Sequence, residues 1–240
     1  MLRSLLIYYG HPLRHRRLTR LYAPFVQPGG LVFDVGAHVG NHIRACLALG
    51  ARVVAIEPQP PFAALLRRLY GRNRHATILE AALGAAPGEA DLHISTRHPT
   101  VTTLAAGWAD EMKRTPSFAA VQWDAQITVP VTTLDALIAA HGLPAFTKID
   151  VEGYELEVLR GVSQPLPALS FEYLPASRAA ALACLDRLAE LAPYEYNWSP
   201  AETARLQPCW HTPTEATAYL ESLPPDAREG NLYAKPISNP

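Results

Sequence analysis

Cysteine is scarce in this sequence, and the few cysteines present do not form a metal-type pattern. The 240 residues include three of them, Cys46, Cys184 and Cys209, which are odd in number and widely spaced. Zinc sites and disulfide frameworks need cysteines in close or paired spacings. We therefore expect reduced thiols and a cytoplasmic location.

Net charge is low and long apolar runs are missing. The formal net charge is −1, which argues against non-specific nucleic-acid binding as the main task. No apolar stretch is long enough to span a bilayer. The apolar start, residues 1–10, is too short for a signal peptide and lacks a small-residue cleavage site. The sequence predicts no nucleic-acid partner and no stable membrane insertion, and it leaves a homo-oligomer open.

Acidic residues are absent from the first thirty-three positions. The same stretch carries several arginines, namely Arg3, Arg14, Arg16, Arg17 and Arg20. We expect residues 1–30 to form a basic helical segment that caps the rest of the chain, although a lid or a docking face for an anionic partner is the alternative. With 49% hydrophobic residues, residues 31–240 suit a single domain with a large core.

Apolar runs alternate with helical patterns along the chain, which predicts an α/β fold with a mostly parallel sheet and helices on both faces. Strands are expected at 31–35, 52–57, 76–80, 90–95, 127–131, 145–150, 168–173, 194–198 and 231–235. Helices are expected at 61–70, from 134 after a Thr132 or Thr133 cap until Gly142, and from 177 to 191.

Two long stretches, 96–126 and 199–230, fit no simple strand–helix rhythm. Long irregular insertions in compact folds are often functional covers, so both are either substrate walls or surface padding. The first stretch contains Trp108 and Trp123. These rings either face a flat or ring-shaped substrate or are buried for structural reasons.

Carboxylates end two neighbouring predicted strands. The segment 31–41 predicts a buried strand, a tight turn and a helix start, with Asp34 in the strand and Gly36 and Gly40 in the turn. Glu57 ends the next strand, at a position where an acid commonly holds the hydroxyls of a ribose. Because ligands of open α/β sheets bind at the carboxyl ends of strands, we expect a nucleotide-like ligand here.

The glycine turn departs from the dinucleotide fingerprint G-x-G-x-x-G. His38 stands where the middle glycine would be, and Asp34 ahead of the first glycine would repel a pyrophosphate. An acid in that position suits a ligand that carries an ammonium and a sulfonium, as S-adenosylmethionine does. A nicotinamide-dependent oxidoreductase on a similar sheet remains the alternative.

The densest group of acids follows the strand at 145–150, in the sequence KIDVEGYE at 148–155. A helix N-terminus favours acids, which explains Glu152 and Glu155. It explains Asp150 poorly, because this residue is expected to end the strand. We therefore expect Asp150 to act at a ligand site, and Lys148 to form an ion pair with a neighbouring carboxylate.

The chain resembles the FkbM family of S-adenosylmethionine-dependent methyltransferases over about residues 30 to 236. The resemblance is carried by FDVGAHVGN at 33–41, AIEP at 55–58, VPVTTLDAL at 129–137, TKIDVEGYELEVLRG at 147–161 and NLYAKP at 231–236. It implies a class I, Rossmann-like methyltransferase fold, with a seven-stranded, mostly parallel sheet whose last strand is antiparallel. The surplus strands near 90–95 and 127–131 would then form an added β-hairpin.

The same resemblance implies O-methylation of a hydroxyl on a small secondary metabolite or a sugar. A catalytically silent member that binds a partner through the basic N-terminal segment is the alternative. The implied cofactor-binding residues are Asp34, Gly36, Ala37, His38, Gly40, Asn41, Glu57, Pro58, Ala82 and Leu83. Glu57 would take the ribose hydroxyls, Ala82 and Leu83 would pack near the adenine, and the turn residues would line the methionine end.

A hydroxyl acceptor needs a base to accept its proton. The first candidate is Asp150, the second is Glu172 at the end of the neighbouring strand, and the third is His38. The family usually has asparagine at position 38, and histidine also tolerates positive φ there. As a minority alternative, Asp150 and Glu172 would hold Mg²⁺, which prefers oxygen ligands.

Overall fold

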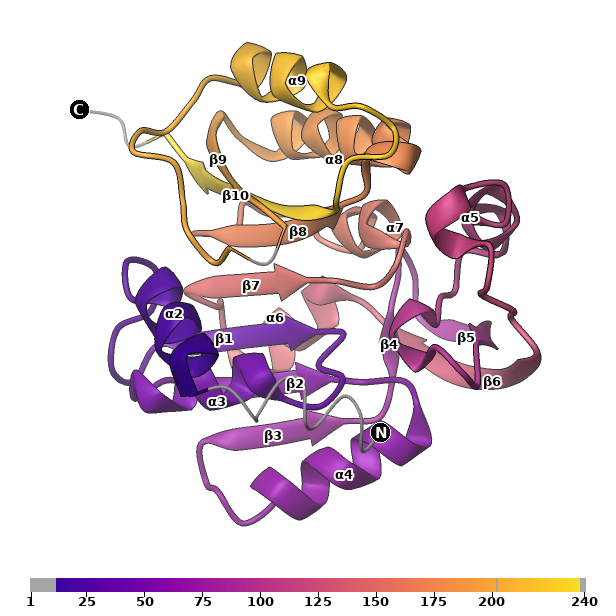
Figure 1. Cartoon of the computed structure of the whole chain (residues 1–240). Helices are drawn as coiled ribbons and strands as arrows, with labels where there is room; N and C mark the ends of the chain where they lie inside the picture. The colour runs from indigo at the N-terminus through magenta and orange to yellow at the C-terminus, as the bar shows by residue number, and fades with distance from the viewer. Residues whose placement is uncertain (1–11, 202, 238–240) are drawn as a thin grey trace.

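The computed structural model describes residues 12–201 and 203–237. The first part of the expected basic segment, residues 1–11 with Arg3, lies outside the described residues. The described chain forms a large sheet flanked by helices, with a smaller sheet beside it (Figure 1).

The large sheet has seven strands in the order β3-β2-β1-β7-β8-β10-β9. The strands are β1 (Leu31–Val35), β2 (Arg52–Ile56), β3 (Ala76–Leu79), β7 (Phe146–Ile149), β8 (Leu169–Tyr173), β9 (Tyr194–Pro200) and β10 (Gly230–Pro236). β1 pairs in parallel with β2 and with β7, whereas β10 runs antiparallel to β8 and β9. The strand order confirms the predicted class I methyltransferase sheet and places a topological switch point between β1 and β7, where such sheets bind ligands.

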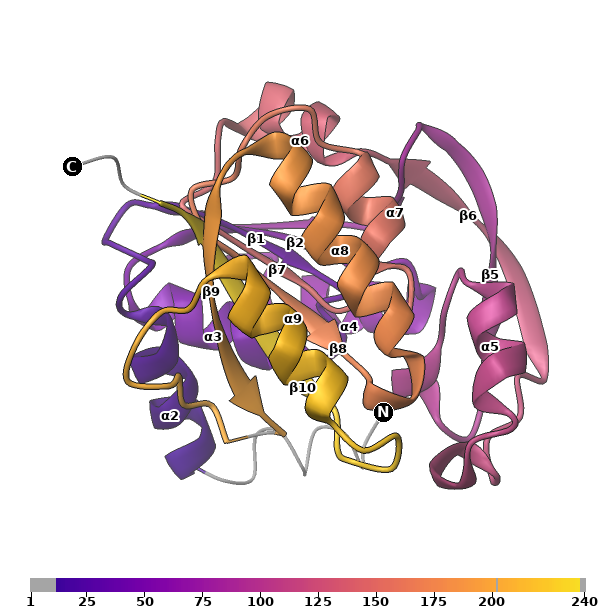
Figure 2. The same cartoon turned by 90° about the horizontal axis from the view of Figure 1, so that it is seen from above.

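Side chains alternate between the two faces of β1, and each face has its own core. Phe33 packs with the cluster formed by α6 (Leu134–His141), α7 (Glu155–Arg160), α8 (Arg178–Leu191) and α9 (Pro213–Ser222). Val32 packs with α2 (Pro12–Tyr22), α3 (Asn41–Ala48) and α4 (Pro60–Tyr70). Figure 2 shows α6, α7 and α8 on one side of the strands and α2 and α3 on the other. None of the described helices is long and apolar enough to cross a bilayer.

Local sequence signals set several helix boundaries as predicted. The Thr133 hydroxyl accepts a hydrogen bond from the Ala136 amide and caps α6, which ends before Gly142. Ser177 directly precedes α8, and α4 begins one residue earlier than expected. β7 ends one residue earlier than expected, at Ile149, so Asp150 follows the strand. Its amide still donates to the carbonyl of Val35, which keeps Asp150 at the edge of β1.

The predicted hairpin is confirmed as β5 (Gly88–Ile94) paired antiparallel with β6 (Ala125–Thr132). A short strand that the sequence did not reveal, β4 (Ala82–Leu83), pairs in parallel with β6. The segment between β5 and β6 contains α5 (Ala106–Met112) and two short 3₁₀ turns, η1 (Pro99–Val101) and η2 (Pro116–Phe118).

The tryptophans of this segment have structural contacts. Trp108 is 7% exposed and meets the rings of Phe118 and Trp123 edge-on. The Trp123 indole donates a hydrogen bond to the carbonyl of Val101. Neither ring lines the two cavities described below. Of the two alternatives, a structural role therefore fits these tryptophans better than contact with a ligand in those cavities.

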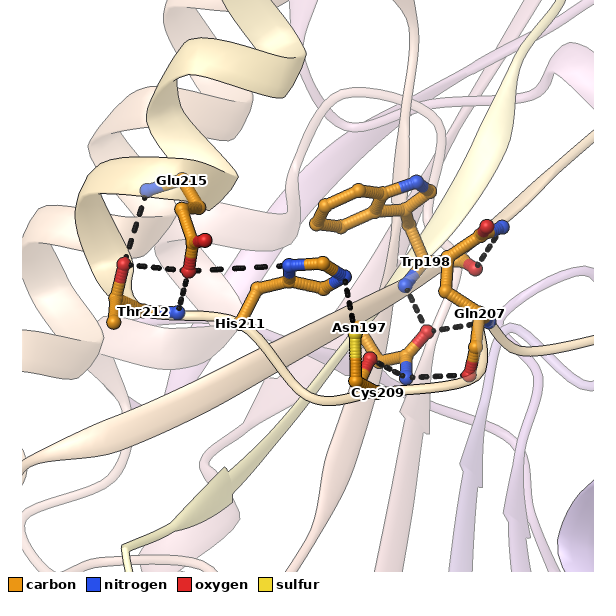
Figure 3. A network of polar contacts seen from close by, with 7 residues as sticks. All are labelled: Asn197, Trp198, Gln207, Cys209, His211, Thr212 and Glu215. Atoms are coloured by element: carbon orange, nitrogen blue, oxygen red, sulfur yellow. Dashed lines mark hydrogen bonds and ion pairs between the residues drawn. The ribbon is translucent and has the colours of Figure 1, made fainter.

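The second irregular stretch is fixed to β9 by a polar network (Figure 3). The Asn197 amide group donates to the carbonyls of Gln207 and Cys209, and its oxygen accepts from the Gln207 amide. The His211 ring stacks on Trp198 with 4.3 Å between the ring centroids. A capping box between Thr212 and Glu215 then begins α9. The part of this stretch from Arg205 to Glu215 is therefore an ordered connection rather than a loose insertion.

Candidate active site

The turn after β1 brings two chain segments into backbone contact. Gly36 has φ 77°, and a Cβ atom there would lie 1.8 Å from the carbonyl oxygen of Asp150. Only glycine allows this approach between the first turn and the end of β7. Gly40 has a different reason, because its Cβ atom would lie 2.7 Å from side-chain atoms of Leu66 and Tyr70 on α4. His38 has φ 47°, which confirms that this residue holds the turn.

A buried lysine connects the turn to the acidic segment. The Lys148 ammonium lies 3.1 Å from Asp150 Oδ2 and 3.5 Å from Asp34 Oδ1, and it donates to the carbonyl of Gly36. The predicted ion pair is thereby confirmed. Burial alone would lower the pKa of Lys148, but Asp150 and Asp34 outweigh it and raise the pKa. Burial raises the pKa of Asp34 to about 6, against the effect of Lys148.

Glu57 is a buried carboxylate directly after β2. Its two oxygens accept hydrogen bonds from the backbone amides of His38 and Gln59, at 2.8 and 2.9 Å. Burial raises the pKa of Glu57 to about 7, although the two amides act in the opposite direction. Each carboxylate oxygen has a second acceptor site, so Glu57 can still accept two hydroxyl groups.

An inner cavity opens at the carboxyl ends of β1 and β2. Of the predicted cofactor residues, its wall includes Gly36, His38, Glu57, Pro58, Ala82 and Leu83. Asp34 and Ala37 are each 1% exposed, and neither they nor Gly40 are part of this wall. Asn41 instead lines a second, outer cavity. Direct contact of these four residues with the cofactor therefore remains a prediction.

Residues that the sequence did not point to complete the inner wall. Three of them, Thr102, Thr103 and Leu104, come from the segment between β5 and β6, and the others include Gln59 before α4, Leu92 on β5 and Tyr154 before α7. The Gln59 amide donates to the carbonyl of Pro99, and the Thr103 hydroxyl donates to the carbonyl of Glu152. The first irregular stretch thus closes the inner cavity.

The outer cavity has a volume of about 390 Å³. Its walls come from α2, the start of α3, the ends of β7 and β8, the chain after β9, and β10. Asp150 and Glu152 line both cavities, so the two spaces meet at these residues. The sequence did not single out His42, Glu229 or Asn231 as wall residues, because the start of α3 and the start of β10 lie far apart in the sequence. Part of the second irregular stretch, including Ser199, also lines this space.

Three carboxyl groups gather where the cavities meet. One oxygen each of Asp150, Glu152 and Glu172 lies within 4.8 Å of the others. Burial, followed by the nearby Asp150, raises the pKa of Glu152 and Glu172 well above the ordinary value, which favours their uncharged forms. Glu155 has the capping role expected for it, because it accepts hydrogen bonds from the amides of Val151 and Gly153.

The same three carboxyls could supply oxygen ligands to a divalent cation, one more than the sequence suggested. Both glutamates would have to lose their protons first. Magnesium therefore stays a prediction.

The candidate bases differ in the space that they face. Asp150 borders both cavities, Glu172 borders only the outer one, and His38 borders only the inner one. Burial lowers the pKa of His38 to about 4, which makes its imidazole a weak base. Of these three candidates, only Asp150 borders both cavities.

The strand order, the glycine turn at the switch point and the acid after β2 are typical of the class I methyltransferase fold. Comparison with known sequences agrees. The chain belongs to the FkbM methyltransferase family, because residues 34–175 match the methyltransferase FkbM domain.

The chain is also similar to the hexuronic acid methyltransferase AglP of Haloferax volcanii. The two sequences are 25% identical over 158 residues, which cover 64% of this chain and 59% of that protein. The chain thus matches about three fifths of the relative's length.

Solved structures with a similar fold include an O-methyltransferase from Bacillus cereus in complex with S-adenosylhomocysteine. It has 11% sequence identity and a TM-score of 0.47, over 95% of this chain and 82% of that one. Another is a predicted O-methyltransferase from Agrobacterium tumefaciens, with 16% identity and a TM-score of 0.45, over 94% of this chain and 81% of that one.

Proposed function

We propose that the protein transfers a methyl group from S-adenosylmethionine to a hydroxyl of a sugar-like acceptor. The cofactor occupies the inner cavity and the acceptor occupies the outer one. The observation that carries this proposal is that Asp150 and Glu152 line both cavities. The outer cavity, with a volume of about 390 Å³, suits a small ligand, whereas the inner cavity, with about 100 Å³, must widen to admit the cofactor. The similarity to a hexuronic acid methyltransferase supports a sugar over a small secondary metabolite.

The residues of the inner cavity fit this cofactor. Glu57 has acceptor sites left for the two ribose hydroxyls, and the apolar side chains of Leu83, Leu92 and Tyr154 provide a surface for the adenine. The backbone at Gly36 borders the methionine end. When bound, S-adenosylmethionine supplies a methyl group that is already activated for displacement.

Asp150 acts as the base in this proposal. With the cofactor bound, the methyl–sulfur bond would break as the acceptor oxygen bonds to the methyl carbon, S-adenosylhomocysteine would be the leaving group, and the acceptor proton would pass to the Asp150 carboxylate. Lys148 holds that carboxylate in place, with its ammonium 3.1 Å from Asp150 Oδ2. Glu172, on the outer wall, is the second candidate and His38 is the third. Family membership argues against the nicotinamide-dependent alternative.

Asp150→Asn separates catalysis from binding. We expect the variant to bind S-adenosylhomocysteine with the affinity of the wild type, as measured by calorimetry. Methyl transfer to a sugar acceptor should fall by about 10²–10⁴-fold, because a positioned base contributes about that much. The matched control is Asp186→Asn, the same change at an exposed position on α8.

If Asp150→Asn transfers methyl groups at the wild-type rate, Asp150 is not the base. If the wild-type protein binds S-adenosylhomocysteine but methylates no hydroxyl, the catalytically silent alternative takes its place. If it does not bind S-adenosylhomocysteine at all, the assignment of the inner cavity fails.

A further inference from the structure

The first turn of α3 places a histidine on the wall of the outer cavity. His42 is the second residue of this helix, and its half-buried side chain lines that space together with Tyr22 and Asp150. It is not part of the wall of the inner cavity. The roles assigned above to Asp150 and Lys148 do not involve this imidazole, although it borders the space assigned to the acceptor.

The side chain of Tyr22 holds the ring of His42. The Tyr22 hydroxyl lies 2.5 Å from Nδ1 of His42, and the two rings are tilted against each other with 5.8 Å between their centroids. Tyr22 is 2% exposed at the end of α2, and its ring also contacts Phe146 on β7. The imidazole is therefore anchored to a side chain that is itself fixed in the core.

The same contact determines which nitrogen of His42 carries the proton. Burial raises the pKa of the Tyr22 hydroxyl well above its ordinary value, so this group keeps its proton. Among the described residues, its only acceptor is Nδ1 of His42, so it donates to that atom. Burial, followed by the charges of Lys148 and Arg14, lowers the pKa of His42 well below its ordinary value. A neutral imidazole that accepts at Nδ1 carries its proton on Nε2.

The Nε2–H group is the edge of the His42 ring that a ligand can reach. In the part of the chain that the structure describes, it makes no hydrogen bond, and it is not among the enclosed polar atoms that lack a partner. It is therefore accessible, and the space that His42 lines is the outer cavity. Neither nitrogen is left to accept a proton, because Nδ1 already accepts from Tyr22. His42 can thus donate to a ligand but does not compete with Asp150 as the base.

We propose that His42 donates a hydrogen bond from Nε2 to an oxygen of the acceptor other than the hydroxyl that is methylated. This inference rests on the proposed function, because it takes the outer cavity as the acceptor site. The reacting hydroxyl gives its proton to Asp150 and a second oxygen accepts from His42, so two contacts of opposite polarity orient the acceptor. The site thereby selects a ligand with at least two oxygen groups, as a sugar has. Tyr22 is a positioning residue that acts through His42.

Imidazole ¹⁵N NMR of the protein saturated with S-adenosylhomocysteine tests the proposal on the wild-type chain. The His42 signals are those missing from the spectrum of His42→Gln. We expect a neutral ring with its proton on Nε2 at neutral pH. Glucose and glucuronate serve as probes, and at least one of them should shift the Nε2 signal of His42.

Variants separate this hydrogen bond from packing. His42→Phe keeps a ring but removes the donor, so the affinity for the probe that binds should fall about three- to tenfold, the effect of one hydrogen bond. His42→Gln should retain more of that affinity, because a glutamine amide can place a donor close to the position of Nε2. Tyr22→Phe should make signals of the Nδ1–H tautomer appear and weaken the affinity less than His42→Phe does.

His75→Phe, at an exposed position, is the control and should bind the probe as the wild type does. The affinity of each variant for S-adenosylhomocysteine shows that it is folded and reports the cofactor site independently. A purely structural role for His42 would lower the stability of His42→Phe but leave probe binding unchanged.

Three results would overturn the inference while leaving the cofactor site intact. The first is a charged His42 ring, or a proton on Nδ1, in the wild type at neutral pH. The second is an Nε2 signal that neither probe shifts. The third is a His42→Phe variant that binds the probe as tightly as the wild type.

Discussion

The absence of a side chain at Gly36 allows the turn after β1 to contact the backbone of Asp150 after β7. Alanine at this position would combine an unfavourable φ with a Cβ atom 1.8 Å from the carbonyl oxygen of Asp150. Gly29 has nearly the same φ, 81°, but open space around its Cβ position. We expect Gly29→Ala to cost about 1–2 kcal/mol, and Gly36→Ala to cost clearly more and to weaken cofactor binding. Urea unfolding of the two variants measures the difference. Equal losses would mean that the turn and the end of β7 are not in contact.

The raised pKa of Glu57 makes the free energy of unfolding depend on pH in a predictable direction. Burial raises the pKa of this carboxyl from 4.5 to about 7 on folding, so the folded chain holds its proton more tightly. The stability that this proton contributes is fully present below about pH 4.5 and is lost as the pH rises through about 7.

The free energy of unfolding of the wild type should therefore fall over that interval, and Glu57→Gln should reduce the slope. Urea unfolding at a series of pH values measures it. Glu190→Gln, at an exposed position on α8, is the control and should retain the wild-type slope. An unchanged slope in Glu57→Gln would show that this carboxyl titrates normally in the folded protein.

The sequence predicted the parts of the site that depend on local signals. Gly36, Glu57 and Asp150 each follow an apolar run, and such positions meet at one edge of a parallel sheet. Arg17 and Asn231 could not be placed in the same way. They reach the outer cavity only because α2 packs against the sheet and β10 runs antiparallel to β8. The sequence around these two residues does not reveal either arrangement.

The helix α2 is part of the core rather than a surface attachment. Leu21 is 6% exposed and packs in the cluster beneath β1, and Tyr22 contacts the ring of Phe146 on β7. We expect Leu21→Ala to lower the free energy of unfolding by about 2–5 kcal/mol. Leu13→Ala, at a position on the same helix that is 55% exposed, should change it by about 0.5 kcal/mol or less. Comparable effects of the two changes would show that α2 is not anchored to the sheet.

All the predicted strands were found within two residues of their expected bounds, including β5 and β6 of the smaller sheet, whereas β4 of that sheet was not predicted. β5 and β6 are longer than expected because their outer residues are exposed and polar, so the apolar pattern covers only their central parts. β4 has only two residues, which is too short to produce any periodicity. Its existence depends on pairing with β6, far along the chain.

At the scale of the whole molecule, the sheet topology determines where the chemistry takes place. The strand order reverses between β1 and β7, which brings the glycine turn and the acidic segment together. The hairpin segment closes the inner cavity, and α2 with the chain after β9 closes the outer one. The carboxylate of Asp150 stands where the two spaces meet.

A crystal structure of the protein with S-adenosylhomocysteine tests this account most directly. The account predicts the ribose hydroxyls on Glu57, the adenine among Leu83, Leu92 and Tyr154, and the sulfur atom facing Asp150 and the outer cavity. Density for the nucleotide in the outer cavity, or with its sulfur directed away from Asp150, would contradict it.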